Sequence, residues 1–163
     1  MIRTVLRSRR RAIQVSLALV IASVPMVLSA PAFGAEVKKP AITLKTASSK
    51  LGNIIVDDKG LSIYMFTVDA RNVSRCEGAC LTAWPPMMLT KDQTLDDVEL
   101  GGNLRRSLLG VAMRENGSRH VTYNGYPLYW WFRDAKAGDV SGQWVGDVWF
   151  VLSDSGAPVS TRL

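Results

Sequence analysis

Histidine and cysteine are scarce in this sequence, and their scarcity limits the chemistry it can support. The 163 residues include one histidine, His120, and two cysteines, Cys76 and Cys80. A structural zinc site normally needs four cysteine or histidine ligands, which three residues cannot supply. The cysteine spacing is one residue too long for haem attachment, and Leu81 stands where the axial histidine would follow. A nucleophile motif, a paired-carboxylate signature and a phosphate-binding loop are also missing, which favours a non-enzymatic protein over an enzyme.

Long apolar runs are equally scarce, and the single one lies near the N-terminus. Residues 1–11 contain five arginines and no acid, residues 12–28 are mainly apolar, and small residues fill 29–35. This order is typical of a secretory signal peptide, which we predict for residues 1–34, followed by a short tether at 35–40. Pro25 and polar interruptions disfavour a membrane-spanning helix, which needs about 20 predominantly apolar residues. Cleavage after Ala32 and cleavage after Gly34 both satisfy the small-x-small rule, and the export route stays open.

The excess of positive charge belongs mostly to this leader. The formal net charge is +6, but without the five leader arginines 15 basic residues face 14 acidic ones. The charge therefore gives no indication of nucleic-acid binding. No cysteine precedes Cys76, so we expect no lipid anchor on a processed N-terminal cysteine, and no membrane span remains after cleavage.

The remaining chain contains an internal repeat with a period of 65 residues. Sliding the sequence by that distance superposes turn, aromatic and acidic residues of the two halves. The matching pairs are Val56 and Val121, Gly60 and Gly125, Tyr64 and Tyr129, Phe66 and Trp131, Asp69 and Asp134, and Trp84 and Trp149. We predict one domain over 41–163, made of two repeats at about 41–94 and 104–152.

The pattern within each repeat predicts strands joined by tight turns. Apolar and polar residues alternate over 42–45 and 61–66, and β-branched residues fill 52–56. The second half predicts strands at 110–114, 119–123, 126–132 and 145–152, with a hairpin turn at Asn124-Gly125. Residues 95–109 predict a linker with a helical turn at 104–108. We therefore expect an all-β fold of two four-stranded antiparallel meanders, packed as one pseudo-twofold sandwich or small barrel.

The two cysteines predict a local disulfide. Cys76 and Cys80 lie four positions apart around Gly78, in a chain predicted to enter an oxidising compartment. The alternative is a copper site that adds soft or imidazole ligands to these sulfurs. Its candidate ligands are Cys76, Cys80, Met87, Met88 and His120. Adjacent residues of a strand point to opposite faces, so at most one of the two methionines can join such a site.

A tyrosine and an aspartate recur five positions apart in each repeat. The motif residues are Tyr64, Phe66 and Asp69, and Tyr129, Trp131 and Asp134. Five is an odd spacing, so within one straight strand the tyrosine and the aspartate face opposite sides. We favour a structural role, in which the tyrosine hydroxyl donates a hydrogen bond and the aspartate accepts backbone N–H groups where the strand ends. The alternative is an acid–base site.

Aromatic residues crowd the second repeat and suggest a ligand platform. Strand alternation places Trp130 and Trp131 on opposite faces, so both faces of that strand are aromatic. One face can belong to the core and the other can bind a ligand or meet the other repeat. The candidate platform residues are Trp130, Trp131, Trp144 and Trp149.

Several stretches together resemble a known bacterial family. Both motifs fit Tyr-x-aromatic-x-x-Asp, and residues 76–80, 83–86, 121–129 and 146–149 match as well. The chain resembles, over about 51–152, the family of secreted and lipoprotein repeats named for that motif, which has no established activity.

Three functions follow as hypotheses, all for a protein exported to the periplasm or beyond. The first is a non-enzymatic cell-envelope module without a cofactor, which binds a small ligand or an envelope component. The second is a redox or copper-handling protein that uses Cys76 and Cys80. The least supported is an enzyme that uses the tyrosine–aspartate pairs. The sequence identifies neither ligand nor oligomeric state.

Overall fold

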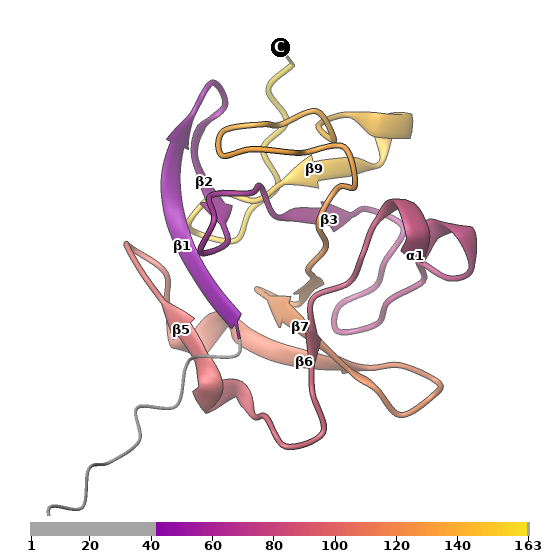
Figure 1. Ribbon diagram of the computed structural model, residues 1–163. Coiled ribbons are helices and arrows are strands. Elements are labelled where there is room, and N and C mark those ends of the chain that lie inside the picture. Colours follow the sequence, from indigo (N-terminus) through magenta and orange to yellow (C-terminus); the bar gives the residue numbers. More distant parts are fainter. Residues whose placement is uncertain (1–41, 163) are drawn as a thin grey trace, which may run out of the picture. The chain divides into compact units, whose positions relative to one another are not determined.

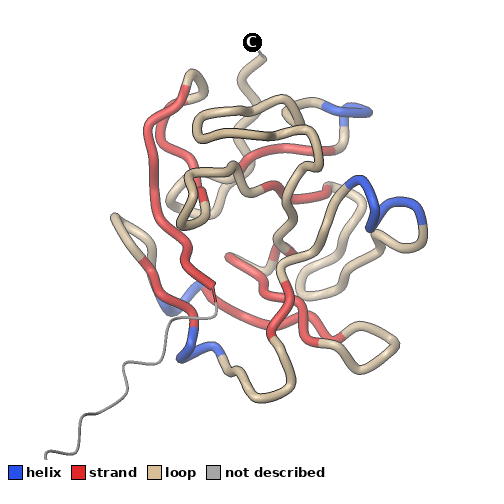
Figure 2. The backbone as a smooth tube through the Cα atoms, in the orientation of Figure 1, coloured by secondary structure: helices blue, strands red, loops and turns tan. Residues whose placement is uncertain are grey.

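The computed structural model describes residues 42–162, so the predicted signal peptide and tether lie outside the described residues. Short strands and long connections dominate this part of the chain (Figures 1 and 2). The strands are β1 (Ile42–Ser49), β2 (Gly52–Val56), β3 (Tyr64–Phe66), β4 (Met88–Leu89), β5 (Val98–Leu100), β6 (Leu109–Met113), β7 (Arg119–Tyr123), β8 (Tyr126–Pro127) and β9 (Trp149–Val151). The helical elements are α1 (Ala79–Ala83) and the 3-10 turns η1 (Leu95–Asp97), η2 (Arg106–Leu108) and η3 (Val145–Asp147).

The prediction of an all-β fold is confirmed at the level of class. β2, β1 and β5 form one sheet, β3 and β9 a second, and β4, β7 and β6 a third, with β8 paired to β7. Within residues 42–162 none of these sheets closes on itself, so the predicted barrel is not confirmed.

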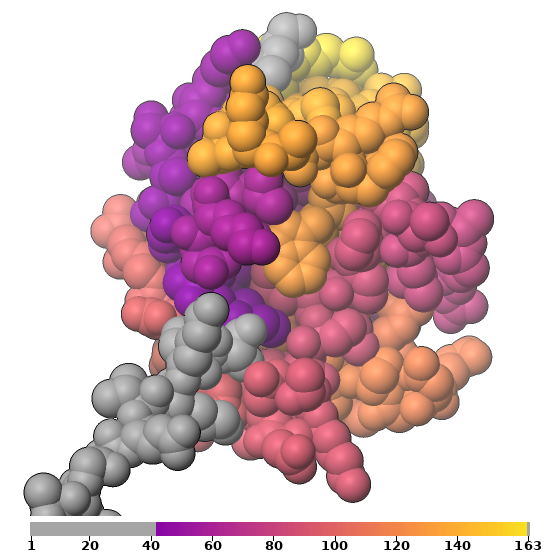
Figure 3. All heavy atoms as spheres, viewed as in Figure 1, coloured from indigo at the N-terminus to yellow at the C-terminus, as the bar shows by residue number. Residues whose placement is uncertain are grey.

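The predicted pair of separate four-stranded meanders needs correction, because the two repeats exchange strands. β3 of the first repeat pairs with β9 of the second, from Tyr64 with Val151 to Phe66 with Trp149. β4 of the first repeat pairs with β7 of the second. The Ile55 N–H of β2 also donates to the Leu152 carbonyl, just after β9, at 2.8 Å. Each repeat therefore completes the sheets of the other. The purple, orange and yellow segments accordingly lie against one another in Figure 3.

The hydrogen bonds also correct the alignment of the repeats at one strand. Ile63 donates to Ile55 in the first repeat, and Leu128 donates to Val121 in the second. Ile55, and not Val56, is therefore the structural counterpart of Val121. Equivalent residues of the two repeats are 65 positions apart before and after β2 and β7, but 66 positions apart within these two strands.

Two apolar cores form, and each draws on both repeats. The first core includes Leu44, Ile55, Ile63, Met65, Met87, Val121, Tyr123, Leu128 and Leu152. The second core includes Ile54, Val56, Tyr64, Trp84, Tyr129, Trp149 and Val151. Adjacent residues of β2 enter different cores because successive side chains of a strand point to opposite faces. Since both cores are shared, neither repeat encloses a core of its own.

The connection between the repeats is more structured than predicted. A helical turn forms at Arg106–Leu108, within the predicted range, but η1 and β5 also lie in the predicted linker. β5 pairs in parallel with the first residues of β1, from Ile42 with Val98 to Leu44 with Leu100. The linker thereby covers an edge of β1.

Candidate functional site

The tyrosines of the two motifs lie side by side at the centre of the described chain. Tyr64 and Tyr129 form an antiparallel bridge, in which each backbone N–H donates to the other's carbonyl at 2.9 and 3.0 Å. Both side chains are fully buried. This bridge lies where the two repeats meet.

Each tyrosine binds the aspartate of the other repeat. The Tyr64 hydroxyl donates to Asp134 Oδ2 at 2.6 Å, and the Tyr129 hydroxyl donates to Asp69 Oδ2 at 2.7 Å. The tyrosine and the aspartate of one motif therefore do not need to lie on the same face of a strand, because each finds its partner in the other repeat. The motif acts between repeats and not within them.

The second carboxylate oxygen of each aspartate holds the following loop. Asp69 Oδ1 accepts from the Arg75 N–H at 2.7 Å. Asp134 Oδ1 accepts from the Ser141 N–H at 3.0 Å and from its hydroxyl at 2.6 Å. Both carboxylates thus connect a buried tyrosine to a turn in the main chain.

Four aromatic rings follow one another across the junction. Trp84 and Trp149 stack with their ring centroids 3.7 Å apart, Phe66 stacks on Trp149 at 4.2 Å, and Trp131 packs on Trp84 at 4.0 Å. The arrangement is symmetric, since Tyr64 contacts Trp84 edge-on at 5.4 Å and Tyr129 contacts Trp149 edge-on at 5.1 Å. We call these six aromatic residues and the two aspartates the central cluster.

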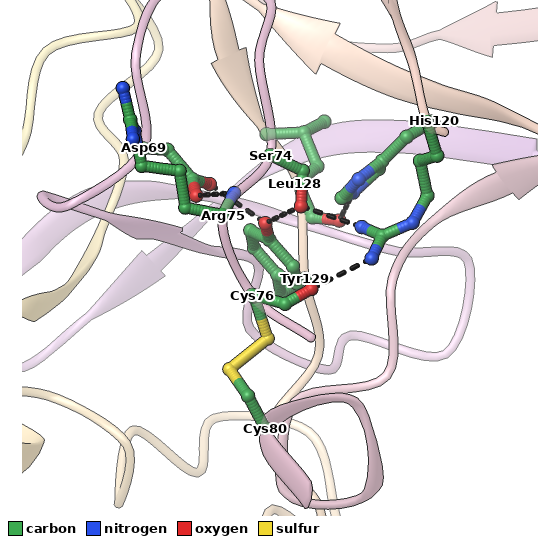
Figure 4. Close-up of a disulfide and its surroundings, with 9 residues drawn as sticks. Asp69, Ser74, Arg75, Cys76, Cys80, His120, Leu128 and Tyr129 are labelled. Carbon is green, nitrogen blue, oxygen red and sulfur yellow. Dashed lines mark hydrogen bonds between the residues drawn. A yellow bond between two sulfur atoms is a disulfide. The ribbon is translucent and has the colours of Figure 1, made fainter. Parts of the chain in front are cut away.

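The surroundings of the two tyrosines differ in polarity. Ser74 Oγ lies 2.8 Å from the Tyr129 hydroxyl, and Arg114 donates to Ser74 Oγ at 2.6 Å and to the Cys76 carbonyl at 2.7 Å (Figure 4). At the equivalent place the Tyr64 hydroxyl accepts from the Gly142 N–H at 3.2 Å. Gly142 has no room for a side chain, because a Cβ there would lie 2.8 Å from the Tyr64 ring. Among the described residues, a cation, Arg114, therefore neighbours Tyr129, while the Tyr64 hydroxyl is bound by a backbone N–H.

Burial shifts the ionisation of this cluster. Desolvation and then Asp134 raise the pKa of Tyr64 above its ordinary value of 10.0. Desolvation is also the main cause that raises the pKa of Tyr129, with Asp69 adding to it. Desolvation raises the pKa of Asp69 as well, although the Arg75 N–H and the Tyr129 hydroxyl oppose the shift. Both tyrosines therefore keep their protons at neutral pH and act as hydrogen-bond donors.

His120 lies beside Tyr129 without joining its hydrogen bonds. The imidazole packs edge-on against the Tyr129 ring at 4.7 Å, and its Nε2 lies 2.7 Å from the Leu128 carbonyl, to which it donates. His120 Nδ1 is buried and has no hydrogen-bond partner within residues 42–162. Burial, reinforced by Arg114, lowers the pKa of His120 to about 4, so the ring is neutral at pH 7.

The predicted disulfide is confirmed. Cys76 and Cys80 are bonded, with their sulfurs 2.01 Å apart, and they hold the connection that runs from Asp69 to Trp84 (Figure 4). The other candidate copper ligands are Met87, Met88 and His120. Met87 is buried in the first core, while Met88 pairs with His120 across β4 and β7. The part of the chain that the structure describes contains no group of three histidine, cysteine or acidic residues placed to hold a metal ion.

The four tryptophans of the candidate platform occupy different places. Trp131 and Trp149 belong to the central cluster. Trp130 packs against the first core and its Nε1 donates to Asp57 Oδ2 at 3.1 Å. Trp144 also borders the first core and contacts Phe150 edge-on at 4.7 Å. Trp131 and Trp149 therefore lie in one cluster, while Trp130 and Trp144 lie outside it and border the first core.

Sequence reasoning missed the polar residues that complete the cluster. Ser141 and Gly142 follow Asp134 in the chain, but nothing in their pattern indicates that one binds the carboxylate and the other the Tyr64 hydroxyl. Arg114 likewise lies in an ordinary strand pattern. Trp84 and Trp149 did leave a signal, because they superpose when the chain is slid by 65 residues.

The fold and the cluster define a two-repeat β protein whose repeats are tied by reciprocal tyrosine–aspartate bonds, with one local disulfide inside the first repeat. A family model matches the chain twice, at residues 45–88 and 110–153, which together exceed half of its length. The chain belongs to this family, Lipoprotein_15, which is described as a secreted repeat of unknown function. The two matched segments start 65 positions apart, as the internal repeat does. Neither a curated protein nor a solved structure matches the chain. Within residues 42–162 no helix has the length and apolar character needed to cross a membrane.

Proposed function

We propose that this protein is an exported, non-enzymatic module of the cell envelope, which binds a small ligand or another envelope component. Its membership of a secreted family supports the location, as does the predicted signal peptide at 1–34. The near balance of charge after residue 34 supports a partner other than nucleic acid.

The reciprocal bonding of the motif residues is the observation that carries the non-enzymatic role. A general acid or base needs a pKa near the working pH and access to its substrate. Tyr64 and Tyr129 have raised pKa values and are fully buried, and Asp134 is 7% exposed. Both oxygens of Asp134 already accept hydrogen bonds. The polar groups of the motif residues therefore serve to join the repeats.

Cell fractionation tests the location. We expect the protein in the periplasm or the medium, with an N-terminus at Phe33 or Ala35. Recovery of the intact chain from the cytoplasm would contradict export. Co-sedimentation of the purified mature protein with peptidoglycan sacculi, and separately with anionic lipid vesicles, then tests envelope binding. Saturable binding to neither preparation leaves a soluble small ligand as the expected partner.

Asp134→Asn tests the role of the motif. The amide keeps the shape of the carboxylate but weakens its bonds to Tyr64 and Ser141, so we expect lower stability. Any cellular phenotype should then follow the folded fraction and recover at lower temperature. Asp92→Asn, at an exposed loop position, is the matched control. A fully folded Asp134→Asn protein without its cellular function would contradict the structural role.

A further inference from the structure

The loop that precedes β9 has an unusual backbone. Trp144 has a φ of 63° and Asp147 a φ of 57°, both in the left-handed region, and Gly146 between them has a φ of 59°. Bulky residues rarely adopt this conformation, and it concentrates at ligand-binding and active-site segments. Here it turns an indole ring and a carboxylate towards the same neighbour.

That neighbour is the side chain of Arg162. Its guanidinium carbon lies 3.9 Å from the centroid of the Trp144 ring, and Nη2 lies 3.2 Å from Asp147 Oδ1. An aromatic face together with a carboxylate is a recognised way to bind a cation. The side chains of Asp147 and Arg162 are largely exposed, at 74% and 69%. Another cation can therefore take the place of the Arg162 guanidinium.

The same loop binds the main chain that leads to Arg162. Gln143 Nε2 donates to the carbonyls of Val159 and Thr161 at 2.6 and 3.2 Å, and Trp144 Nε1 donates to the Thr161 carbonyl at 3.0 Å. On the other side the Val159 N–H donates to the Val151 carbonyl of β9 at 2.9 Å. The segment 158–162 thus lies between β9 and the Gln143 side-chain amide, towards the end marked C in Figure 1.

Few of the contacts to segment 158–162 involve its side chains. Val159 packs against the second core, and Arg162 meets the indole and the carboxylate. The remaining bonds are made by the backbone N–H of Val159 and by the carbonyls of Val159 and Thr161, and so do not depend on side chains. A surface cavity of about 290 Å³ adjoins the segment and is lined by Val140, Ser141, Gln143, Trp144 and Arg162. The site therefore has room beside the segment for a larger occupant.

We propose that the 143–147 loop and β9 form a binding site for an extended peptide of a partner protein, with an apolar residue three positions before an arginine. The segment 158–162 occupies this site in cis and mimics that peptide. Main-chain bonds alongside a strand provide affinity, and the two side-chain positions provide specificity. The inference stands apart from the envelope function, because peptide binding can fail while export holds.

A labelled synthetic peptide that reproduces residues 157–163 tests the site by fluorescence anisotropy. The full chain with Arg162→Ala should bind it at least fivefold more tightly than the wild-type chain, because the cis arginine no longer competes. A peptide with alanine in place of its arginine should bind at least fivefold more weakly. Equal affinity of the two peptides, or no saturable binding by the Arg162→Ala chain, overturns the proposal.

Two further variants place the binding at this loop. Asp147→Asn on the Arg162→Ala background changes only an exposed carboxylate and should weaken peptide binding severalfold. Arg133→Ala removes a comparable pair elsewhere, since the Arg133 guanidinium lies 5.1 Å from the Phe132 ring, and should leave binding unchanged. If ultracentrifugation shows that the wild-type chain exchanges this segment within a dimer, the occupant is a second copy and the partner proposal is overturned.

Discussion

Trp84 and Trp149 occupy equivalent positions of the two repeats and stack on each other, with ring planes only 5° apart. Each ring is 4% exposed, and each contacts the motif tyrosine of its own repeat. The pair therefore joins the repeats at the same place as the crossed hydrogen bonds do.

Removing one of these rings should destabilise the whole protein. We expect Trp84→Ala to lower the free energy of unfolding by about 3–5 kcal/mol, because it leaves a cavity between three aromatic neighbours. Urea denaturation measures this change. Phe132→Ala, which truncates an aromatic ring that is 56% exposed, should change stability by about 0.5 kcal/mol or less. Equal effects of the two substitutions would contradict the proposed importance of the stack.

A double-mutant cycle distinguishes bonding between repeats from bonding within them. Tyr64→Phe alone should cost about 0.5–1.5 kcal/mol. Combined with Asp134→Asn it should show an interaction energy of about 1 kcal/mol or more, because both changes remove the same hydrogen bond. Combined with Asp69→Asn, in its own motif, Tyr64→Phe should be additive within about 0.5 kcal/mol. The opposite pattern would show that the crossed bonds do not form in solution.

The exchanged strands predict a single unfolding transition. Within residues 42–162, β3 and β4 pair only with strands of the second repeat, so neither half can form all of its strand pairings alone. Calorimetry of the mature chain should give equal calorimetric and van't Hoff enthalpies. Separate halves, about 41–94 and 104–163, should lack dispersed NMR signals. Two separated transitions would show that each repeat is a domain.

The disulfide should contribute modestly. It closes a very short loop, so replacing both Cys76 and Cys80 by serine should cost about 2 kcal/mol or less. Mass spectrometry of exported protein should give the oxidised mass without metal. Bound copper, or a pair of free thiols, would favour the redox or copper-handling alternative.

His120 should make stability depend on pH. Its pKa is about 4 in the folded protein and 6.5 ordinarily, so the unfolded chain takes up the proton first as the pH falls. The stabilisation is present above pH 6.5 and is lost between 6.5 and 4, by roughly 3 kcal/mol.

Gln provides the control for this titration. In His120→Gln the amide N–H can still donate to the Leu128 carbonyl, but nothing titrates at this position. Urea denaturation at pH 7.5, 5.5 and 4.5 should show a steeper loss for the wild-type chain than for the variant. Parallel pH profiles would show that His120 is protonated without cost in the folded state.

The sequence predicts the local features of this protein better than its connections. The turn at Asn124-Gly125 forms with both residues at positive φ, the conformation that a type I′ two-residue hairpin requires. The disulfide and the 65-residue period were also visible. By contrast β5 has three residues and α1 five, which is too short for periodicity to register.

The crossed partners could not be predicted from spacing alone. Tyr64 is five positions from Asp69 and 70 from Asp134, and only the fold decides which of them it meets. The shift of one residue between β2 and β7 was hidden for another reason. The turn before β7 is one residue longer than the turn before β2, and the turn after β7 is one residue shorter than the turn after β2. The two differences cancel outside these strands, so a comparison without gaps superposes Val56 on Val121.

The exchange of strands has a consequence for how such a protein can originate. A chain with one repeat contains a tyrosine and an aspartate that cannot satisfy each other. Two copies related by twofold symmetry supply both partners, both stacked indoles and the missing strands. Gene duplication followed by fusion then converts that homodimer into one polypeptide. Once fused, the two copies are free to differ, as the surroundings of the two tyrosines do, with Arg114 near Tyr129 and the Gly142 N–H at Tyr64.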